Sequence, residues 1–239
     1  MRVIVLGCGT GIGKTRVSVA LLRAMASRGR AALGLKPIES GITRGTDSTA
    51  PPNGSDAASL AAAGSVWTHL EHPLYALRDP VSPHLAARSS GIQLDPGLVA
   101  AWIERAEAEV ASRIVPYRAL WTVIETAGGV FSPLGVGVSN FELAQHLDPA
   151  IWVLVAPDSL GVLHEVSSTL KAMRASGRAP DHLVLSGARE PDASTGGNAS
   201  ELATLGILTP SAVLARNDDS GVNALLDRLL ATPPAALAR

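Results

Sequence analysis

The clearest pattern in the chain is a series of short runs of consecutive apolar residues, separated by stretches in which apolar residues recur with helical spacing. A short apolar run bounded by turn residues is typical of a strand buried on both faces of a parallel sheet. We therefore predict buried strands at residues 2–6, 31–35, 120–125, 151–156 and 182–187.

Helices are predicted between these strands, and their ends carry recognisable start and stop residues. Gly29 follows the first helical stretch, and glycine commonly ends helices. Ser55 or Asp56 is suited to cap the start of the second, and Pro96 is suited to the first position of the third. The predicted helices span residues 14–28, 55–63, 95–113 and 160–176.

This alternation of strand and helix predicts the fold class. Apolar strands joined by helices favour a parallel sheet covered on both faces. No short-period repeat or linker divides the chain, so we predict an α/β, doubly wound, single-domain fold over residues 1–232, with a flexible tail at 233–239. Residues 43–55, rich in Pro, Gly, Ser and Thr, are expected to form a mobile loop. Ligands bind such sheets at the carboxyl ends of the strands.

Composition limits the function classes that remain. Of the 239 residues, 46% are hydrophobic and 17% are charged, as expected of a globular protein. The formal net charge of −1 favours neither nucleic acid nor an anionic membrane as a partner. No apolar run has the length of a membrane span or a signal peptide, and the single cysteine excludes an internal disulfide. We therefore expect a cytoplasmic protein.

A glycine-rich segment, "GCGTGIGKT" at residues 7–15, follows the first predicted strand and opens the first predicted helix. Glycines allow backbone N–H groups to surround phosphate oxygens, and the start of the helix adds positive charge. Lys14 would reach the terminal phosphates, and the hydroxyl of Thr15 would bind Mg²⁺. The segment thus predicts a P-loop, although Cys8 occupies the place where the common pattern has a glycine.

Lysine is scarce, since only three of the 20 basic residues are lysines. A compact ammonium fits among phosphate oxygens where a planar guanidinium is too bulky, so a retained lysine in a constrained turn indicates a function. Lys36, in "KPIESG", follows a predicted strand and precedes a proline. We interpret Lys36 as a second cation at the reacting group, with a solvated loop lysine as the alternative. Lys171 has the setting of an ordinary helix surface.

Two acidic residues are candidates for metal binding, one at the end of a predicted strand and one at the start of a predicted helix. Glu125 ends the apolar run 120–125, where an unpaired charge is costly. Asp56, taken alone, is as well explained as a helix cap. Together with Thr15, the two carboxylates would form a hard-oxygen set suited to Mg²⁺.

These segments, in this order, resemble the dethiobiotin synthetase family, whose members are ATP-dependent ligases that close the ureido ring in biotin synthesis. The resemblance covers nearly the whole chain, and the family's P-loop has the same additional residue that Cys8 represents here. It rests on "GCGTGIGKT", "LKPIESG", "SDAASLAAAG", "DPVSPHLAA", "ETAGGVFSPL" and "SLGVLHEVSSTL".

The resemblance implies a reaction and a set of site residues. The substrates would be 7,8-diaminononanoate, CO₂ or bicarbonate, and ATP or another nucleoside triphosphate, with Mg²⁺ as cofactor. The protein would be a homodimer, with residues 159–164 binding the substrate carboxylate at the subunit interface. Lys36, Lys14 and Ser40 would be the catalytic residues, and Thr15, Asp56 and Glu125 the metal ligands. The implied nucleotide-binding residues are Gly9, Thr10, Gly11, Ile12, Gly13, Lys14, Thr15, Arg16, Asp56, Glu125, Thr126, Ala127 and Gly128.

The chain departs from the family pattern at three places. Gly11 stands where many members have glutamate, and Thr126 where they have glycine. The predicted strand at 182–187 ends in "LSGARE" and lacks the asparagine that reads adenine in the family. The choice of nucleobase is therefore left open.

Two other functions remain as alternatives. A related ligase could act on another diamine. A P-loop switch ATPase of the plasmid-partition or septum-positioning kind would share the architecture, but such proteins have an additional lysine near the start of the loop, and residues 7–13 contain none. His69 and His72, three residues apart with no evident third ligand, are predicted to be surface histidines.

Overall fold

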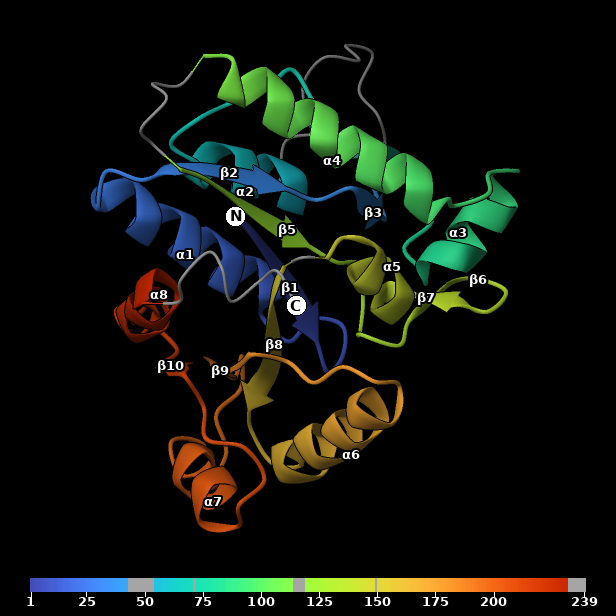
Figure 1. Cartoon of the computed structure of the whole chain (residues 1–239). Coiled ribbons are helices and arrows are strands. Elements are labelled where there is room, and N and C mark those ends of the chain that lie inside the picture. The colour runs from blue at the N-terminus through green and yellow to red at the C-terminus, as the bar shows by residue number, and fades with distance from the viewer. Residues whose placement is uncertain (43–53, 71, 114–118, 149, 232–239) are drawn as a thin grey trace.

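The protein forms a layered α/β structure in the computed structural model (Figure 1). The expected tail at 233–239 lies outside the described residues, as does the expected loop at 43–55 except for its last two residues. The structure describes residues 1–42, 54–70, 72–113, 119–148 and 150–231.

A six-stranded parallel sheet forms the centre, with strand order β10-β9-β8-β1-β5-β2. The predicted strands are all present, and β2, β5 and β9 have the predicted bounds. The strands are β1 (Arg2–Gly7), β2 (Ala31–Leu35), β5 (Leu120–Glu125), β8 (Ile151–Asp158), β9 (His182–Gly187) and β10 (Ala212–Leu214).

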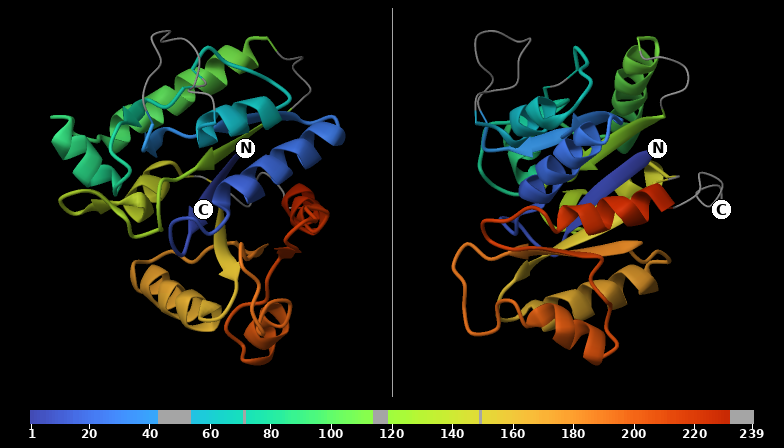
Figure 2. Two further views of the ribbon diagram at one scale, coloured as in Figure 1. Left: turned by 180° about the vertical axis from the view of Figure 1, so that it is seen from behind. Right: turned by 90° about the vertical axis from the view of Figure 1, so that its left-hand side faces the viewer.

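Helices cover both faces of this sheet, which confirms the doubly wound prediction (Figure 2). One face packs against α1 (Lys14–Ser27), α2 (Asp56–Ala63) and α8 (Val222–Ala231). The other face packs against α3 (Pro83–Ser89), α4 (Pro96–Ala111), α5 (Asn140–His146), α6 (Val162–Ala175) and α7 (Asn198–Thr204). Alternate residues of β1 serve the two faces, since Ile4 and Leu6 belong to one core and Val3 and Val5 to the other.

The ends of the helices differ slightly from the predicted ones. Gly29 has a φ of +67° and ends α1 as predicted. Helix α6 begins at Val162, two residues later than expected, because Gly161 is its N-cap with a φ of 98°. None of the helices in the described ranges has the length and apolar character needed to cross a bilayer.

Short elements that the sequence did not predict surround the end of β2. Strands β3 (Ile38–Ser40) and β4 (Tyr75–Leu77) form a separate parallel pair, and β6 (Pro133–Gly135) and β7 (Val138–Ser139) form an antiparallel pair. Helices α3 and α5 adjoin these pairs, and all of them lie near the carboxyl ends of β1, β2 and β5 (Figure 1). The unpredicted elements thus lie beside the expected ligand site.

Candidate active site

The sheet order brings three of the predicted segments together. Strand β5 lies between β1 and β2, and all three run in parallel, so their carboxyl ends meet at one edge. The P-loop follows β1, Lys36 follows β2, and Glu125 is the last residue of β5. This arrangement places the predicted phosphate, lysine and carboxylate sites next to one another.

The P-loop has the backbone that its glycines predict. Gly11 and Gly13 have positive φ values of 72° and 94°, and Gly13 is the N-cap of α1. The ammonium of Lys14 donates to the carbonyl oxygen of Gly9 at 3.1 Å, so its side chain curls back over the loop. Burial lowers the pKa of Lys14 to about 8. A phosphate in this loop would therefore meet a lysine already held at its rim.

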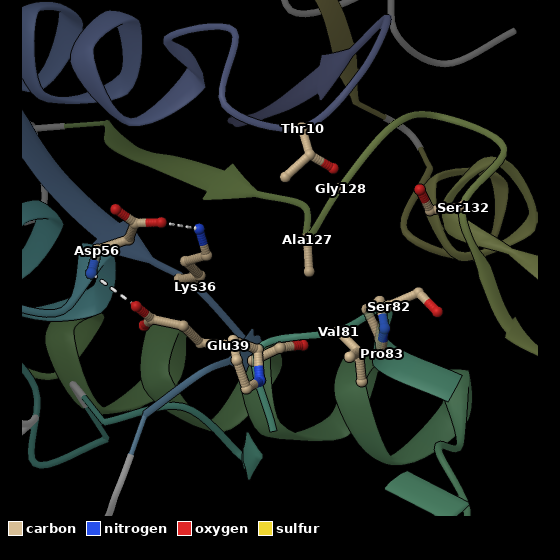
Figure 3. Close-up of a pocket in the computed structure, with 12 residues that line it drawn as sticks. Thr10, Lys36, Glu39, Asp56, Val81, Ser82, Pro83, Ala127, Gly128 and Ser132 are labelled. Carbon is tan, nitrogen blue, oxygen red and sulfur yellow. Dashed lines mark hydrogen bonds and ion pairs between the residues drawn. The ribbon is translucent and has the colours of Figure 1, made fainter. Parts of the chain in front are cut away.

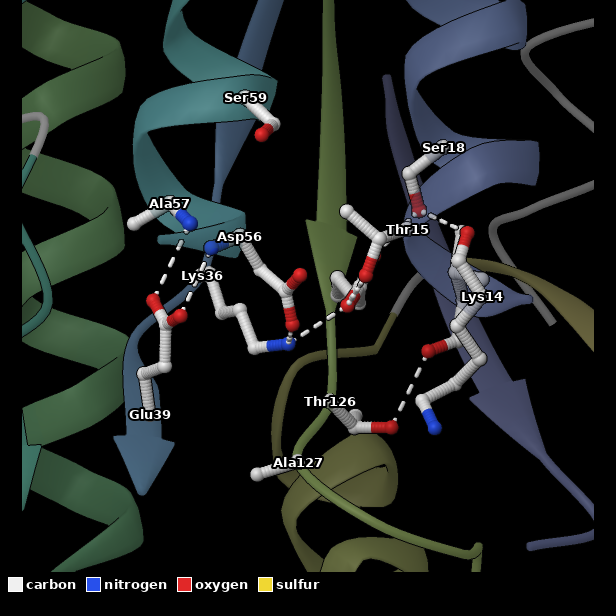
Figure 4. Close-up of polar contacts among 12 residues, drawn as sticks. Lys14, Thr15, Ser18, Lys36, Glu39, Asp56, Ala57, Ser59, Thr126 and Ala127 are labelled. Carbon is white, nitrogen blue, oxygen red and sulfur yellow. Dashed lines mark hydrogen bonds and ion pairs between the residues drawn. The ribbon is translucent and has the colours of Figure 1, made fainter. Parts of the chain in front are cut away.

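Glu125 is fully buried and receives hydrogen bonds from three side chains, those of Thr15, Ser18 and Lys36. Figure 4 shows these three side chains, with Lys36 beside Asp56. Its Oε1 accepts from Thr15 Oγ1 at 2.8 Å and from Lys36 Nζ at 2.7 Å. Its Oε2 accepts from Ser18 Oγ at 2.8 Å. A buried carboxylate is tolerated when it is paired and hydrogen-bonded in this way. Glu125 thereby joins the P-loop helix to the segment after β2.

Lys36 forms ion pairs with both Asp56 and Glu125 and is 6% exposed. Burial alone would lower the pKa of Lys36, but the negative charges of Glu125 and Asp56 outweigh it and raise that pKa. The prediction of a functional Lys36 is therefore favoured over that of a solvated loop lysine. Lys36 remains an ammonium and carries a fixed positive charge at the site.

Asp56 and Ser55 have separate roles at the start of α2. Ser55 is the N-cap, and its hydroxyl accepts from the backbone N–H of Ala58 at 3.1 Å. The carboxylate of Asp56 instead points to Lys36 and is 43% exposed. Burial alone would raise the pKa of the Asp56 carboxyl group, but the positive charge of Lys36 outweighs it and lowers that pKa. The alternative that Asp56 serves only as a cap is therefore wrong.

The three predicted metal ligands form a donor set that fits Mg²⁺. Thr15, Asp56 and Glu125 offer one hydroxyl and two carboxylates, and all three share hydrogen bonds or ion pairs in one network. Mg²⁺ in nucleotide sites takes one or two carboxylates and completes its shell with phosphate and water. No cluster of three or more His, Cys, Asp or Glu side chains able to hold a metal occurs among the described residues. His69 is highly exposed and contacts Glu109.

A pocket of about 420 Å³ opens beside this network (Figure 3). Ser40 lines it, and its hydroxyl is buried without a hydrogen-bond partner in the described part of the chain. Such an orphaned hydroxyl suits a ligand group that completes its bonding. Other predicted residues that line the pocket are Thr10, Lys36, Asp56, Ala127 and Gly128. The residues that sequence analysis did not identify are Glu39, Pro80, Val81, Ser82, Pro83 and Ser132.

Glu39 is a buried carboxylate whose role depends on a contact between distant segments. Its two oxygens accept from the backbone N–H groups of Asp56 at 2.7 Å and Ala57 at 3.1 Å. The pKa of Glu39 is raised, and burial is the largest cause of this shift. Glu39 thus holds the first turn of α2, and with it the backbone that carries Asp56.

We expect Glu39→Ala to lower the free energy of unfolding by about 1–2 kcal/mol, because two N–H groups at the start of α2 lose their acceptor. The affinity for Mg²⁺-nucleotide should fall as well, since Asp56 loses its fixed backbone. Urea denaturation and titration calorimetry measure the two effects. Ser55→Ala is the matched control, because it removes a cap from the same helix outside the pocket. Unchanged stability and affinity in Glu39→Ala would contradict this role.

The loop after β5 is fixed by two side chains. Asn140 is fully buried, and its amide nitrogen donates to the carbonyl oxygens of Ala127 at 2.6 Å and Gly129 at 2.8 Å. The hydroxyl of Thr126 donates to the carbonyl of Val5 at 3.0 Å. The side chain of Thr126, expected among the nucleotide contacts, is therefore turned toward β1, and its backbone N–H donates to the same carbonyl at 3.1 Å. Asn140 carries no sequence signal that would have identified it.

Two further P-loop predictions have different outcomes. Cys8 is half-buried and packs against the core, and burial raises the pKa of its thiol to about 11. A protonated thiol of this kind is a small packing group, as its place in the loop suggests. The guanidinium of Arg16, expected among the nucleotide contacts, bonds instead to the turn after β10.

Comparison with known proteins identifies relatives over most of the chain. A family model described as an AAA domain matches residues 1–219. An ATP-dependent dethiobiotin synthetase of Nitrosospira multiformis is 35% identical, with 72% of this chain and 69% of the relative covered. The enzyme of the same name from Anaeromyxobacter dehalogenans is 33% identical, with 88% of this chain and 87% of the relative covered.

Solved structures with the same architecture include more distant proteins. A MinC:MinD cell division protein complex of Aquifex aeolicus matches with a TM-score of 0.54 and 9% identity, covering 97% of this chain and 96% of the other. The signal recognition particle receptor FtsY of Elizabethkingia anophelis matches with a TM-score of 0.52 and 13% identity, covering 94% of this chain and 64% of the other. At this identity the likeness concerns the P-loop fold alone.

Proposed function

Since the chain belongs to the family of ATP-dependent dethiobiotin synthetases, we propose that it closes the ureido ring of dethiobiotin from 7,8-diaminononanoate, CO₂ and a nucleoside triphosphate at the site described above. The observation that carries the proposal is Lys36, held between Asp56 and Glu125 beside the P-loop. In this proposal Lys36 acts as a fixed cation between the triphosphate and the pocket, as a transfer of phosphate to a substrate anion requires.

The triphosphate binds in the P-loop, residues 9–15, where backbone N–H groups and Lys14 surround its oxygens. Thr15, Asp56 and Glu125 would hold Mg²⁺, which when bound neutralises charge on the phosphates. Lys36 stays paired with the carboxylates until the substrate anion arrives. The protein itself contributes position and charge and forms no covalent bond in this scheme.

The diamine lies in the pocket lined by Ser40 and Val81. One amine captures CO₂ as a carbamate and releases a proton, and Lys14 and Lys36 stabilise the resulting anion. A carbamate oxygen takes the γ-phosphoryl group, which gives a mixed anhydride and nucleoside diphosphate. The neighbouring amine attacks the carbonyl carbon, the ring closes, and phosphate leaves. Ser40 hydrogen-bonds the substrate through the hydroxyl that has no other partner.

We also propose that the protein acts as a homodimer. Leu160 is 82% exposed in the segment 159–164, which in the family resemblance meets the substrate carboxylate at the subunit interface. In the proposed dimer, Leu160 would be covered by the partner chain. Analytical ultracentrifugation should give twice the mass of the chain, and a monomer would contradict this part of the proposal.

The proposed reaction is tested by incubating the protein with diaminononanoate, bicarbonate, Mg²⁺ and each nucleoside triphosphate. Dethiobiotin, followed by mass spectrometry, should appear only when all components are present. Absence of product from folded protein with every nucleotide would refute the proposal. Formation of a cyclic urea from a different diamine, with none from diaminononanoate, would favour the alternative substrate.

We predict a relaxed preference for the nucleobase. The strand β9 ends without the adenine-reading asparagine, so a wrong base leaves few buried polar groups unpaired. Most of the binding energy should come from the triphosphate, which every nucleotide presents equally. At least one other triphosphate, CTP being the first to test, should lie within roughly tenfold of ATP in kcat/KM, or about 1.4 kcal/mol. Discrimination on the order of a thousandfold for ATP would contradict this prediction.

A further inference from the structure

The sheet order determines on which side of the P-loop a nucleoside must lie. Strands β5 and β2 lie on one side of β1, and their ends carry Lys36, Glu125 and the substrate pocket. Strands β8, β9 and β10 lie on the other side. A triphosphate in the P-loop that presents its γ-phosphate to the pocket would therefore extend its ribose and base away from β5 and β2, toward the side of β8, β9 and β10.

The end of β9 is in close contact with both the P-loop and the segment after β10. A Cβ atom added at Gly13 would come within 2.2 Å of Ser186 Oγ. A Cβ atom added at Gly187 would come within 2.5 Å of the backbone nitrogen of Arg216. The loop that binds phosphate, the end of β9 and the segment after β10 thus form one continuous surface.

The segment 215–220, which we call the β10–α8 turn, is exposed at every residue and yet is held in a fixed shape. Within it, Asp218 N donates to the carbonyl of Ala215 at 3.0 Å. The N–H and hydroxyl of Ser220 donate to the carboxylate of Asp218 at 2.8 and 2.9 Å. These bonds give the exposed turn a defined shape.

Arg16 fastens this turn to the P-loop helix. Its Nε donates to the carboxylate of Asp219 at 2.8 Å. Its terminal nitrogen donates to the carbonyl oxygens of Ala215 and Asp218. One guanidinium therefore bonds to three residues of the turn, and it does so from the third residue of α1, directly after the two residues that bind phosphate and metal.

We propose that Arg16 is a positioning residue for the nucleobase: it holds the β10–α8 turn as a wall against which the base packs. The inference rests on the proposed use of a nucleoside triphosphate. Arg16 would then contribute to the binding of the nucleoside and not to the binding of the triphosphate.

A second arginine provides a matched control. Arg28 follows the other end of α1 and bonds to Asp227 and Asn223 of α8. Arg16 and Arg28 thus each join α1 to the C-terminal part of the chain, but only Arg16 lies next to the P-loop. If Arg16 merely stabilised the fold, the two alanine variants would behave alike.

The test is titration calorimetry of ATP, CTP and inorganic tripolyphosphate with Arg16→Ala and Arg28→Ala. We expect Arg16→Ala to weaken the binding of both nucleotides about tenfold, the equivalent of one or two hydrogen bonds. The affinity for tripolyphosphate should stay within twofold of the wild-type value. Arg28→Ala should leave the affinities for all three ligands within twofold of the wild-type values. Arg16→Lys, which keeps one donor and the charge, should recover part of the nucleotide affinity.

Equal weakening of tripolyphosphate and nucleotides by Arg16→Ala would overturn the inference, since Arg16 would then act on the P-loop itself. Unchanged binding of all three would overturn it as well. If Arg16→Ala does not fold, Asp219→Asn serves in its place, because it removes only the carboxylate partner of Arg16. We then expect a smaller loss of affinity for ATP and CTP, again without a loss of affinity for tripolyphosphate. These binding measurements do not depend on product formation. Failure to make dethiobiotin, with the selective loss intact, would therefore refute the proposed reaction and leave the role of Arg16 standing.

Discussion

Replacement of Lys36 with alanine should lower kcat by about 10²–10³, because one preorganised positive donor is lost where charge develops on the carbamate and the transferring phosphate. The variant should also be less stable, because the loss of Lys36 leaves the fully buried carboxylate of Glu125 without its ammonium partner. The kcat is therefore measured under conditions in which circular dichroism shows the variant to be folded. Stopped-time assays of dethiobiotin at saturating nucleotide measure the effect on kcat.

Lys171→Ala is the control for this substitution. Lys171 lies on the exposed side of α6 and bears the same charge, so its loss should leave kcat within twofold of the wild-type value. If Lys36→Ala retained more than a tenth of the wild-type kcat, Lys36 would not be catalytic.

Glu125→Gln should have the largest combined effect on stability and ligand binding. Glu125 is fully buried and accepts from Thr15, Ser18 and Lys36, so the substitution leaves a buried ammonium with one carboxylate fewer. Breaking a buried ion pair costs on the order of 3–5 kcal/mol, and we expect the lower end because Asp56 remains. The Mg²⁺-dependent part of nucleotide affinity should fall too, since one charge leaves the proposed metal site.

Asp56→Asn separates these two effects. Asp56 is 43% exposed, so its loss should cost less stability, while the metal site loses the same unit of charge. Calorimetric titration of ATP with and without Mg²⁺, together with urea denaturation, measures both quantities. If neither variant changed the Mg²⁺-dependent affinity, the assignment of both carboxylates as metal ligands would be wrong.

Five of the six strands of the main sheet could be predicted because they carry a strong local signal, whereas the three-residue strand β10 was not predicted. Residues 31–35, 120–125 and 182–187 are continuous apolar runs bounded by turn residues, and the structure has strands with these bounds. The pair β3–β4 could not be predicted, because each strand has only three residues and pairs with a segment more than 30 residues away. Such short strands have no period of their own and depend on the packing around them.

The site shows the same division between local and distant signals. Lys36 and Glu125 lie at predicted strand ends, and Lys14 lies in the glycine-rich segment after another, so all three were expected at the ligand-binding edge of the sheet. Glu39 and Asn140 were missed because their partners are backbone groups of other segments, at Asp56 and at Ala127. A side chain that bonds to a distant backbone leaves no pattern in the sequence. Arg16 was expected at the nucleotide because of its neighbours, and its side chain follows a tertiary contact instead.

The contact between Gly13 and Ser186 has a consequence for the side chains that these two segments can accept. An added Cβ at Gly13 would lie 2.2 Å from Ser186 Oγ, and the φ of Gly13 is +94°. A larger side chain at 186 in the rotamer of Ser186 would therefore carry more heavy atoms toward the backbone of Gly13, whose φ favours glycine. We expect such a change to disturb the P-loop unless the side chain adopts another rotamer. The end of β9 and the phosphate loop are thus expected to constrain each other's sequence.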